Sequence, residues 1–455
     1  MFDFIYSLFA FIIAISILVA VHEFGHFWVA KKLGVKVLRY SIGFGRPLWK
    51  KRFGNDQTEY VIAALPVGGY VKMLYQREGE VAQSEQHRAF NRQTVATRFA
   101  IVAAGPVFNF IFAALAYWLM LTLGVSGLKP VIGEISPESV MARAGFEVND
   151  EIVSINGQST PIWDIAIQEL VISALNREAA EVVISKGDSL TESKYIDFQS
   201  VGKYEEPDEA LKAIGLKPWR PDIAAVVGKI IKDSPAEKAG LKIKDKIVAV
   251  GGTTINNWYD LVNKVSTKPD EVLDFAIDRD GKQINLKIRP RLIESNGKKV
   301  GQIGIGPMDT VKIPDDMQRI YQYPLITGLM QAGDKVWRNS VLTLKMIGKL
   351  LTGQVSLKNL SGPINIAVYA GYSASAGLPR FLDFLAIISI SLGVINLLPI
   401  PLLDGGHLMY YLVEIIKGQP VSERFEMLGQ RIGISIIILM MALAIGNDLS
   451  RLFGG

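Results

Sequence analysis

Four long apolar segments constrain this chain more than any other feature of its sequence. Each of the four lacks Asp, Glu, Lys and Arg throughout: residues 4–21, 99–128, 384–403 and 432–447. An α-helix of about 20 residues crosses the roughly 30 Å hydrocarbon core of a bilayer. The last segment is the shortest, but Met427 and Leu428 extend it, and the Arg431 side chain can reach the interface. The sequence therefore predicts a polytopic α-helical membrane protein with four transmembrane helices.

The composition narrows the function classes further. Only 20% of the residues are charged, against about a quarter in an ordinary soluble protein. The absence of cysteine excludes a disulfide scaffold, a thiolate nucleophile and a Cys-ligated metal site. The net charge of +5 is too small and too dispersed for a nucleic-acid surface, so we expect the lipid bilayer and no nucleic acid among the partners.

The basic residues predict the orientation of the four helices. Residues 31–98 contain 13 Lys or Arg and five Asp or Glu. Such an excess marks the cytoplasmic side of a membrane. Both termini and residues 129–383 are then expected outside the cytoplasm. Because Met1-Phe2-Asp3 lacks the basic region of a cleavable signal peptide, we expect the first helix to be retained.

A repeated β-rich pattern occupies the outside segment. Three blocks recur at one offset of 95 residues: 132–135 with 227–230, 144–145 with 239–240, and 150–157 with 245–252. One shared register indicates two copies of one domain. Residues 234–252, with their Ser-Pro and Ala-Gly-Leu motifs, resemble bacterial PDZ domains, which bind an extended peptide as an added strand. The resemblance implies two extracytoplasmic PDZ domains with Leu216 and Ile305 facing a peptide; the alternative is two packed β domains with degenerate grooves.

The first apolar segment continues into the motif His22-Glu23-Phe24-Gly25-His26. Residues four apart project from one face of a helix, so both imidazoles can bind one metal ion. Glu23, next to them, can deprotonate a metal-bound water. The same pattern also occurs on ordinary solvated helices. In an apolar helix, however, these polar side chains are costly unless they face a partner or a cavity, so we predict a metal site.

Two histidines leave a catalytic zinc one protein ligand short. Asp404 closes the third apolar segment, and the first and third helices both end at the cytoplasmic leaflet, so the three groups are expected at similar depth. Asp404 as a simple helix cap is the alternative. His407 is expected to contact a ligand rather than the metal, because the fourth position is needed for water. Two His and one carboxylate favour one zinc per chain.

The motif His-Glu-x-x-His in a first helix, followed by Asn-x-x-Pro-x-Pro-x-x-Asp-Gly at residues 396–405, resembles the site-2 family of intramembrane metalloproteases. The resemblance implies that His22, His26 and Asp404 are the zinc ligands and that Glu23 is the general base. It also implies a reaction, peptide hydrolysis in the cytoplasmic half of a single-pass transmembrane substrate, with the active site near the cytoplasmic leaflet of the inner membrane.

Further residues acquire roles from the same resemblance. Asn396 is expected near the scissile carbonyl, where an amide can hold the substrate backbone or the oxyanion. Pro399 and Pro401 interrupt helical hydrogen bonding and imply irregular backbone beside a cavity.

Two Gly-rich segments flank the strand-like residues 59–65 in the cytoplasmic loop, and neither fits a nucleotide-binding loop. The resemblance implies that they form a membrane-associated β-sheet near the zinc, whose edge can pair with an unwound substrate. The substrate-binding residues expected there are Gly43, Phe44, Gly45, Gly68, Gly69 and Tyr70. His87 is expected to be a solvated loop residue.

Substrates and competing functions complete the prediction. The resemblance implies an anti-sigma factor already cut by a first protease, possible signal-peptide remnants as further substrates, and a PDZ pair that acts as a size filter. The filter can act by steric exclusion or by binding a new carboxyl terminus. The alternatives are a non-catalytic PDZ scaffold or chaperone, and a zinc transporter. An intact metal-binding set disfavours the first, and polar groups at a single depth disfavour the second.

We expect the chain to divide into nine segments. They are a first transmembrane helix 1–31, a cytoplasmic loop 32–97, a second helix 98–126, PDZ domains at 127–220 and 221–309, a juxtamembrane helical segment 310–380, a third helix 381–412, a loop 413–426 and a fourth helix 427–450. Apolar positions alternate with Lys and Arg between 320 and 375. This favours an amphipathic helix on the membrane surface or a helix packed on the second PDZ domain.

Overall fold

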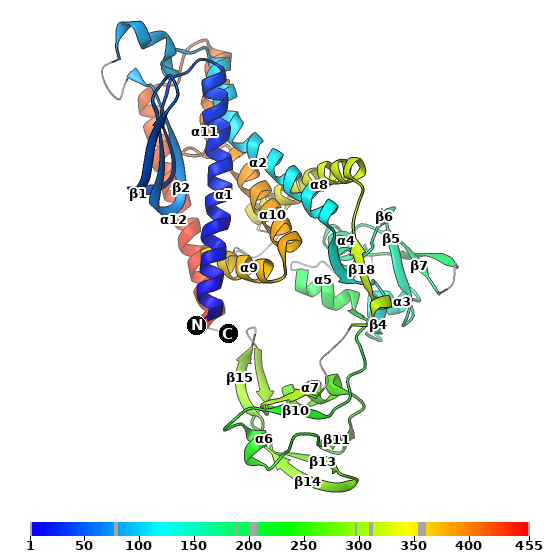
Figure 1. Ribbon diagram of the computed structural model, residues 1–455. Coiled ribbons are helices and arrows are strands. Elements are labelled where there is room, and N and C mark those ends of the chain that lie inside the picture. The colour runs from blue at the N-terminus through cyan, green and yellow to red at the C-terminus, as the bar shows by residue number, and fades with distance from the viewer. Residues whose placement is uncertain are drawn as a thin grey trace. The chain divides into compact units, whose positions relative to one another are not determined.

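The computed structural model describes residues 2–76, 81–187, 190–199, 207–295, 298–308, 313–353 and 361–453. The chain forms two compact units, shown in Figure 1. The first unit combines residues 1–125 with 321–448, and we call it the helical unit. The second consists mainly of residues 126–320. The expected boundary between residues 309 and 310 lies outside the described residues.

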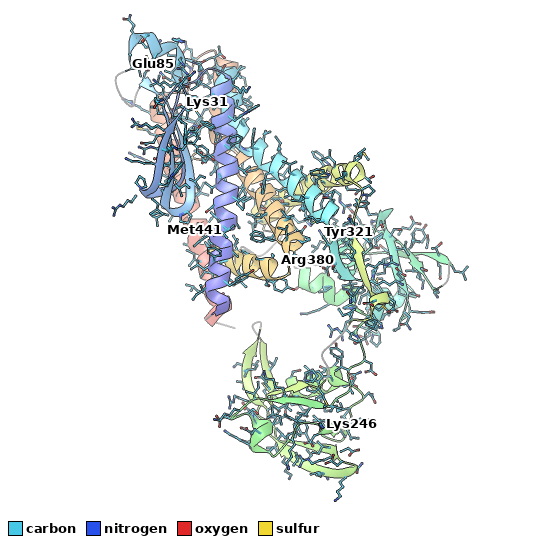
Figure 2. The ribbon with its side chains drawn as sticks, in the orientation of Figure 1. Lys31, Glu85, Lys246, Tyr321, Arg380 and Met441 are labelled. Atoms are coloured by element: carbon cyan, nitrogen blue, oxygen red, sulfur yellow. The ribbon has the colours of Figure 1, made fainter. Side chains whose placement is uncertain are left out.

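Four helices of the described chain are long and apolar enough to cross a membrane, as the sequence predicts. They are α1 (Phe2–Lys32), α2 (Val95–Leu123), α10 (Leu378–Leu397) and α12 (Glu423–Phe453). Within the helical unit, α2 packs against both α1 and α10 (Figure 1). Figure 2 shows charged side chains at both ends of this unit, with Lys31 and Glu85 at one end and Arg380 toward the other.

The third apolar segment is not the single helix expected over 381–412. Helix α10 ends at Leu397, and a separate helix α11 (Asp404–Lys417) begins after six intervening residues. Pro399 and Pro401 cause this break, since proline lacks an N–H and disfavours helical backbone in the residue before it. Leu402, just before α11, has a φ of +102°. Such a conformation costs about 1–3 kcal/mol and is usually held in place by its surroundings at functional sites.

The segment expected to be juxtamembrane contains several elements. A 3-10 turn (Asp315–Met317) and strand β18 (Gln318–Tyr321) precede helices α8 (Leu325–Leu351) and α9 (Pro363–Ser375). Helix α8 packs on α2 and α10 through polar contacts. Asn339 donates to the Tyr117 hydroxyl at 2.8 Å, and Lys335 lies 3.2 Å from the Asp383 carboxylate. The helix therefore belongs to the helical unit.

The loop between α1 and α2, which the sequence predicts to be cytoplasmic, contains strands β1 (Val37–Phe53) and β2 (Thr58–Met73). Residues 39–42 of β1 pair with residues 59–62 on one side and with residues 69–72 on the other, so each long strand folds back along the sheet. Gly43 and Gly45 have φ values of +91° and +86°, which glycine adopts without a Cβ clash. Short 3-10 turns at Gln83–Arg88 and Phe90–Arg92 follow, and His87 lies in the first.

The second unit contains two β-rich modules with the same order of elements except before the last strand, where module 1 has a helix and module 2 a hairpin. Module 1 consists of β4 (Ile132–Ile135), α3 (Val140–Arg143), β5 (Glu151–Ile155), β6 (Gln158–Ser159), α4 (Trp163–Asn176), β7 (Ala180–Ser185), β8 (Thr191–Ile196), α5 (Pro207–Ile214) and β9 (Leu216–Pro218). Its sheets have the orders β6-β5-β7-β8 and β4-β9. Strand β3 (Val125–Leu128) pairs with β18 outside these sheets.

Module 2 consists of β10 (Val227–Ile230), α6 (Pro235–Lys238), β11 (Lys246–Val250), β12 (Thr253–Thr254), α7 (Trp258–Ser266), β13 (Leu273–Arg279), β14 (Lys282–Ile288), β15 (Arg291–Ser295), β16 (Lys298–Gln302) and β17 (Ile305–Pro307). Its sheets β12-β11-β13-β14 and β10-β17 correspond to those of module 1, and β15 and β16 form an extra hairpin. The sequence repeat is therefore also a repeat of structure.

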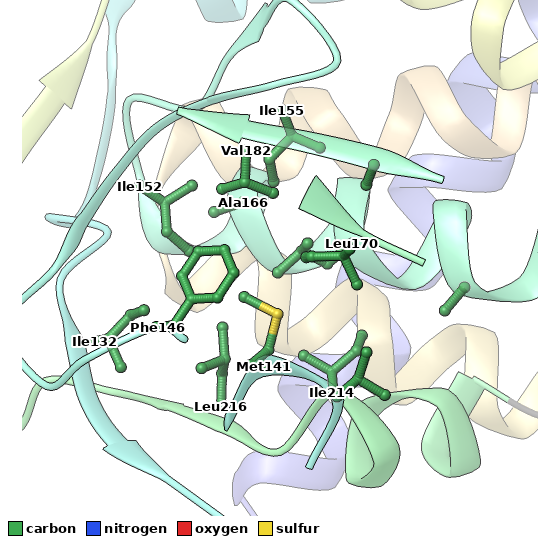
Figure 3. Close-up of a cluster of buried hydrophobic side chains, with 14 of the residues drawn as sticks. Ile132, Met141, Phe146, Ile152, Ile155, Ala166, Leu170, Val182, Ile214 and Leu216 are labelled. Carbon is green, nitrogen blue, oxygen red and sulfur yellow. The ribbon is translucent and has the colours of Figure 1, made fainter. Parts of the chain in front are cut away.

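Each module is built around its own apolar core. Figure 3 shows the core of module 1, in which Ile152, Leu170 and Val182 from two strands and a helix meet Met141 and Phe146. Module 2 has an equivalent cluster of buried Ile, Val, Leu, Phe and Trp side chains. Because each core is complete within its module, the two modules can be treated as separate domains.

Candidate metal centre and active-site cavity

The two histidines of the motif lie where α1 meets α2. The helices approach closely because both contribute glycine at the contact. A Cβ on Gly25 would collide with the Ala104 backbone, and a Cβ on Gly105 would lie 2.8 Å from His22 Cε1. Small residues allow two membrane helices to pack this closely. The α1–α2 contact thus forms one wall of the site.

Asp404, the first residue of α11, lies against both histidines. Its Oδ2 atom is 3.2 Å from His22 Nε2 and 3.5 Å from His26 Nε2, and the two Nε2 atoms are 3.3 Å apart. Two ligand atoms at 2.0–2.1 Å from a tetrahedral zinc lie about 3.3 Å from each other. The three atoms therefore have the mutual spacing that a zinc ion requires.

The protonation of His26 supports the same interpretation. Its Nδ1 atom lies 2.9 Å from the carbonyl oxygen of Ile101, which can only accept a hydrogen bond. In the neutral ring the hydrogen is then on Nδ1, and Nε2 directs a lone pair at Asp404. Asp404 Oδ2 is buried and receives no hydrogen bond. Lone pairs that converge in a buried place fit a cation held between them, and two His with one carboxylate suit zinc.

A cavity of about 350 Å³ opens beside these three residues. Glu23 and Asn396 line it, together with Leu402 and Leu403 from the loop before α11. The third contribution comes from strand β2, where Gly69, Tyr70, Val71 and Met73 face the cavity. With Val102 of α2, four segments of the chain therefore surround one space in which a peptide bond and a water molecule fit. The other three are in α1, β2 and residues 396–404.

The remaining residues predicted for the sheet lie close to this cavity. The Phe44 ring stacks on that of Tyr70, with centroids 6.0 Å apart and planes 12° apart. A Cβ on Gly68 would contact Phe44, and one on Gly69 would lie 2.9 Å from Glu23 Cγ. Gly69 and Tyr70 therefore line the cavity beside Glu23, and Phe44 lies against Tyr70 and Gly68. Gly43 and Gly45 lie against Leu65 of the same sheet.

The two prolines and His407 support the site less directly. Pro401 packs against α12, where a Cβ on Gly429 would lie 3.4 Å from the proline ring. Pro399 lies in the same break in the helix. The His407 ring packs edge to face against Tyr410 and lines a separate cavity of about 750 Å³ that also reaches Val71 and Met73. The group of three possible ligands comprises His22, His26 and Asp404 without His407.

The two residues predicted to face a peptide in the modules differ in exposure. Ile305 lines a groove of about 240 Å³ in module 2, between α7 and the strands β16 and β17. The contact of Leu216 with a peptide stays a prediction, and in this structure the side chain is only 6% exposed and belongs to the core of module 1. The reason is α5, whose Ala210 and Ile214 side chains are buried in the same core.

The contribution of α2 to the site is absent from the sequence prediction. Gly105, Ile101 and the fully buried Asn109 all lie against the histidines from this helix. No motif marks them. The available signal was Asn109 itself, a polar side chain in a 30-residue uncharged segment, which is costly in lipid without a partner.

Comparison with known proteins assigns this geometry to a family. The model of peptidase family M50 matches residues 10–440. The chain belongs to peptidase family M50. The regulator of sigma-E protease RseP of Salmonella typhimurium is 43% identical over 454 residues, which cover 99% of this chain and 100% of that protein. Protease RseP of Yersinia pestis is 44% identical over 455 residues with the same coverage.

A relative from Vibrio cholerae, 42% identical over 453 residues, carries a zinc metalloprotease name. Among solved structures, a PDZ domain of the SdrC-like protein from Listeria monocytogenes matches 19% of this chain and 88% of its own length, at 19% identity and a TM-score of 0.17. The M50 family and these relatives identify the chain as a membrane-embedded zinc metalloprotease of the site-2 type.

Proposed function

We propose that this M50 protease hydrolyses a peptide bond of single-pass membrane proteins in the cavity formed by α1, strand β2 and residues 396–404. The observation that carries the proposal is the convergence of His22, His26 and Asp404 beside Glu23 in one cavity. We assign the first three as the ligands of one zinc ion per chain. Zinc bound there supplies Lewis-acid polarisation of a carbonyl and lowers the pKa of a water.

The chain's own residues would perform the proton transfers. Glu23, on the wall of the cavity, accepts the proton of the attacking water and later donates it to the leaving amine. Asn396 lines the same cavity, where its amide N–H can bind the substrate carbonyl or the oxyanion. Helices α1, α2 and α11 partly enclose the site, and the lower dielectric on that side would strengthen both interactions.

Strand β2 is proposed to hold the substrate in an extended form. Within the described part of the chain, residues 69–71 pair with β1 on one side, so they form an edge of the sheet there, and all three line the cavity. An exposed edge adds a strand by backbone hydrogen bonding. Helical peptide bonds are hidden from a nucleophile, so a substrate helix has to unwind before cleavage. Pairing with this edge would stabilise the unwound segment next to Glu23.

The two modules are proposed to be PDZ domains that filter substrates by size. Support comes from their repeated element order and from the groove in module 2. We infer that they and both termini lie in the periplasm and that the active site faces the cytoplasmic leaflet of the inner membrane, because the basic loop 31–98 marks the cytoplasmic side. By analogy with the relatives named for sigma-E, the proposed substrate is an anti-sigma factor after a first cut; signal-peptide remnants are a second candidate class.

The first test compares wild type with Glu23→Gln on a single-pass model substrate in detergent. Removing the general base is expected to lower the cleavage rate by about 10²–10⁴-fold, while bound zinc, measured by elemental analysis, stays at one per chain. Asp404→Ala is the matched control, since it should lose both zinc and cleavage. Equal cleavage by wild type and Glu23→Gln would contradict the assigned chemistry.

The size filter is tested with one substrate in two forms, with and without a folded domain on its periplasmic side. We expect wild type in proteoliposomes to cleave only the trimmed form. A variant that lacks residues 127–309 should cleave both, because the filter is gone. If wild type cleaves both forms at the same rate, the proposed size filter is contradicted, but the protease assignment is not.

A further inference from the structure

Helix α2 supplies a hydrogen-bond partner to each histidine of the metal site. The Ile101 carbonyl accepts from Nδ1 of His26 at 2.9 Å. Two helical turns later, the Asn109 side chain lies 3.1 Å from Nδ1 of His22. Metal-binding histidines generally donate their other ring N–H to such a partner, which fixes the tautomer and the ring orientation. Both partners come from α2 and face Nδ1 of a histidine, but one is a backbone carbonyl and the other is a side-chain amide.

The orientation of the Asn109 amide decides which tautomer of His22 is favoured. With the nitrogen toward His22, the amide donates to Nδ1, and the imidazole hydrogen is left on Nε2, the atom that faces Asp404. That tautomer cannot direct a lone pair at a metal ion. With the amide rotated by 180°, Oδ1 accepts from Nδ1–H, and Nε2 becomes a ligand, as it is in His26.

Little in the surroundings holds the amide in the first orientation. Asn109 is fully buried, and its Oδ1 atom makes no hydrogen bond. The two orientations of an amide have nearly the same shape, so rotation requires no repacking. The backbone is fixed independently, because the Ser389 hydroxyl of α10 donates to the Asn109 carbonyl at 2.8 Å.

We propose that Asn109 is a positioning residue of the metal site: its carboxamide oxygen accepts from Nδ1–H of His22 and thereby directs Nε2 toward the zinc. Asn109 does not contact the metal or the substrate in this role. The Ile101 carbonyl performs the same task for His26. The inference rests on the ligand assignment made above for His22, His26 and Asp404.

The test measures zinc affinity of the full-length chain in detergent by competition with a chelator. Asn109→Leu has almost the same size but no acceptor, and we expect it to bind zinc about 10–100-fold more weakly than wild type. Asn109→Asp retains an acceptor oxygen at the same distance and should stay within about 3-fold of wild type. Ser389→Ala removes the other hydrogen bond at this position and is the packing control, also expected within about 3-fold.

Two results would overturn the proposal. One is wild-type affinity in Asn109→Leu. The other is an equal loss in Asn109→Leu and Asn109→Asp, which would mean that the acceptor is not what matters. Only monodisperse fractions are compared. If Asn109→Leu does not fold, Asn109→Ala takes its place as the variant without an acceptor, and its zinc affinity is compared with that of Asn109→Asp. A wild-type chain that binds no zinc would instead refute the ligand assignment itself.

Discussion

The two modules of the second unit hold a buried carboxylate at the same place with different partners. Asp150 in module 1 and Asp245 in module 2 are 95 residues apart, and they are 3% and 1% exposed. Each accepts a hydrogen bond from a backbone N–H three residues earlier, Glu147 at 2.9 Å and Lys242 at 2.7 Å. This shared bond fixes the turn before the first long strand of each sheet.

The positive partner of the carboxylate differs between the modules. In module 2, Arg279 at the end of β13 donates from Nε and Nη2 to the two oxygens of Asp245, both at 2.7 Å. In module 1, Lys194 on β8 lies 3.7 Å from Asp150 and also donates to the Gly145 carbonyl. A planar guanidinium makes two charge-assisted bonds where an ammonium makes one. The repeat therefore keeps the aspartate, while the positively charged partner comes from a different strand in each module.

The same divergence appears beside the helices α4 and α7. In module 1, α5 packs against α4 and buries Ala210 and Ile214. In module 2, the hairpin β15–β16 stands in the corresponding chain position, and a groove of about 240 Å³ remains along α7. Of the two modules, the second thus offers the better-formed place for a bound peptide.

The largest expected difference between the modules comes from removing the two bases. Arg279→Ala leaves the Asp245 charge buried without its main partner, and we expect a loss of about 3 kcal/mol in the stability of module 2. Lys194→Ala removes the longer contact with Asp150 and the bond to the Gly145 carbonyl, and it should cost module 1 about 1.5 kcal/mol. Native-state hydrogen exchange of β11 and β5 in the full-length chain measures both. Equal losses would show that the bidentate geometry adds nothing.

A smaller effect is expected in the response of module 2 to acid, through the Asp245 carboxylate. Burial alone would raise the pKa of Asp245, but the bonds from Arg279 and the Lys242 N–H outweigh it and lower the pKa below its ordinary value. A carboxylate with a lowered folded-state pKa stabilises the fold above its unfolded pKa of about 3.9, and this contribution is lost as the pH falls below that value. Module 2 should therefore lose stability below about pH 4.

Arg279→Ala provides the control for the acid response. Without the guanidinium, the lowering of the Asp245 pKa disappears. The opening free energy of β11, from exchange rates corrected for their intrinsic pH dependence, should then depend less on pH between about 5 and 3. A variant with the same acid response as wild type would mean that other carboxylates in module 2 dominate it.

The sequence predicts the parts of the molecule that depend on local pattern. Uncharged runs identify the four long helices, and the 95-residue offset identifies the repeat, because both are properties of neighbouring residues. The proposed metal ligands could also be found in the sequence, since the two histidines are one helical turn apart and Asp404 closes another apolar segment. The structure brings these three side chains within 3.5 Å of one another.

What the sequence does not predict depends on contacts between distant segments. The close approach of α2 through Gly105 has no motif, because glycine is common in membrane helices. The buried Asn109 indicates a polar partner but does not say which one. The position of Leu216 in the core of module 1 follows from α5, which has no counterpart in the repeat. The end of α10 at Leu397 could be inferred from the two prolines, but the left-handed conformation of Leu402 could not.

The smallest expected difference concerns the N-termini of α4 and α7. The Asn257 side chain accepts a hydrogen bond from the Asp260 N–H at 2.9 Å and caps α7, whereas Ile162 precedes α4 without a side-chain cap. Asn257→Ala should destabilise module 2 by about 1 kcal/mol. Asn256→Ala, at the exposed neighbouring position, is the control and should change stability by less than about 0.5 kcal/mol. Hydrogen exchange of α7 distinguishes the two variants, and equal effects would mean that the nine-residue helix is held by Trp258 and Leu261 in the core rather than by its cap.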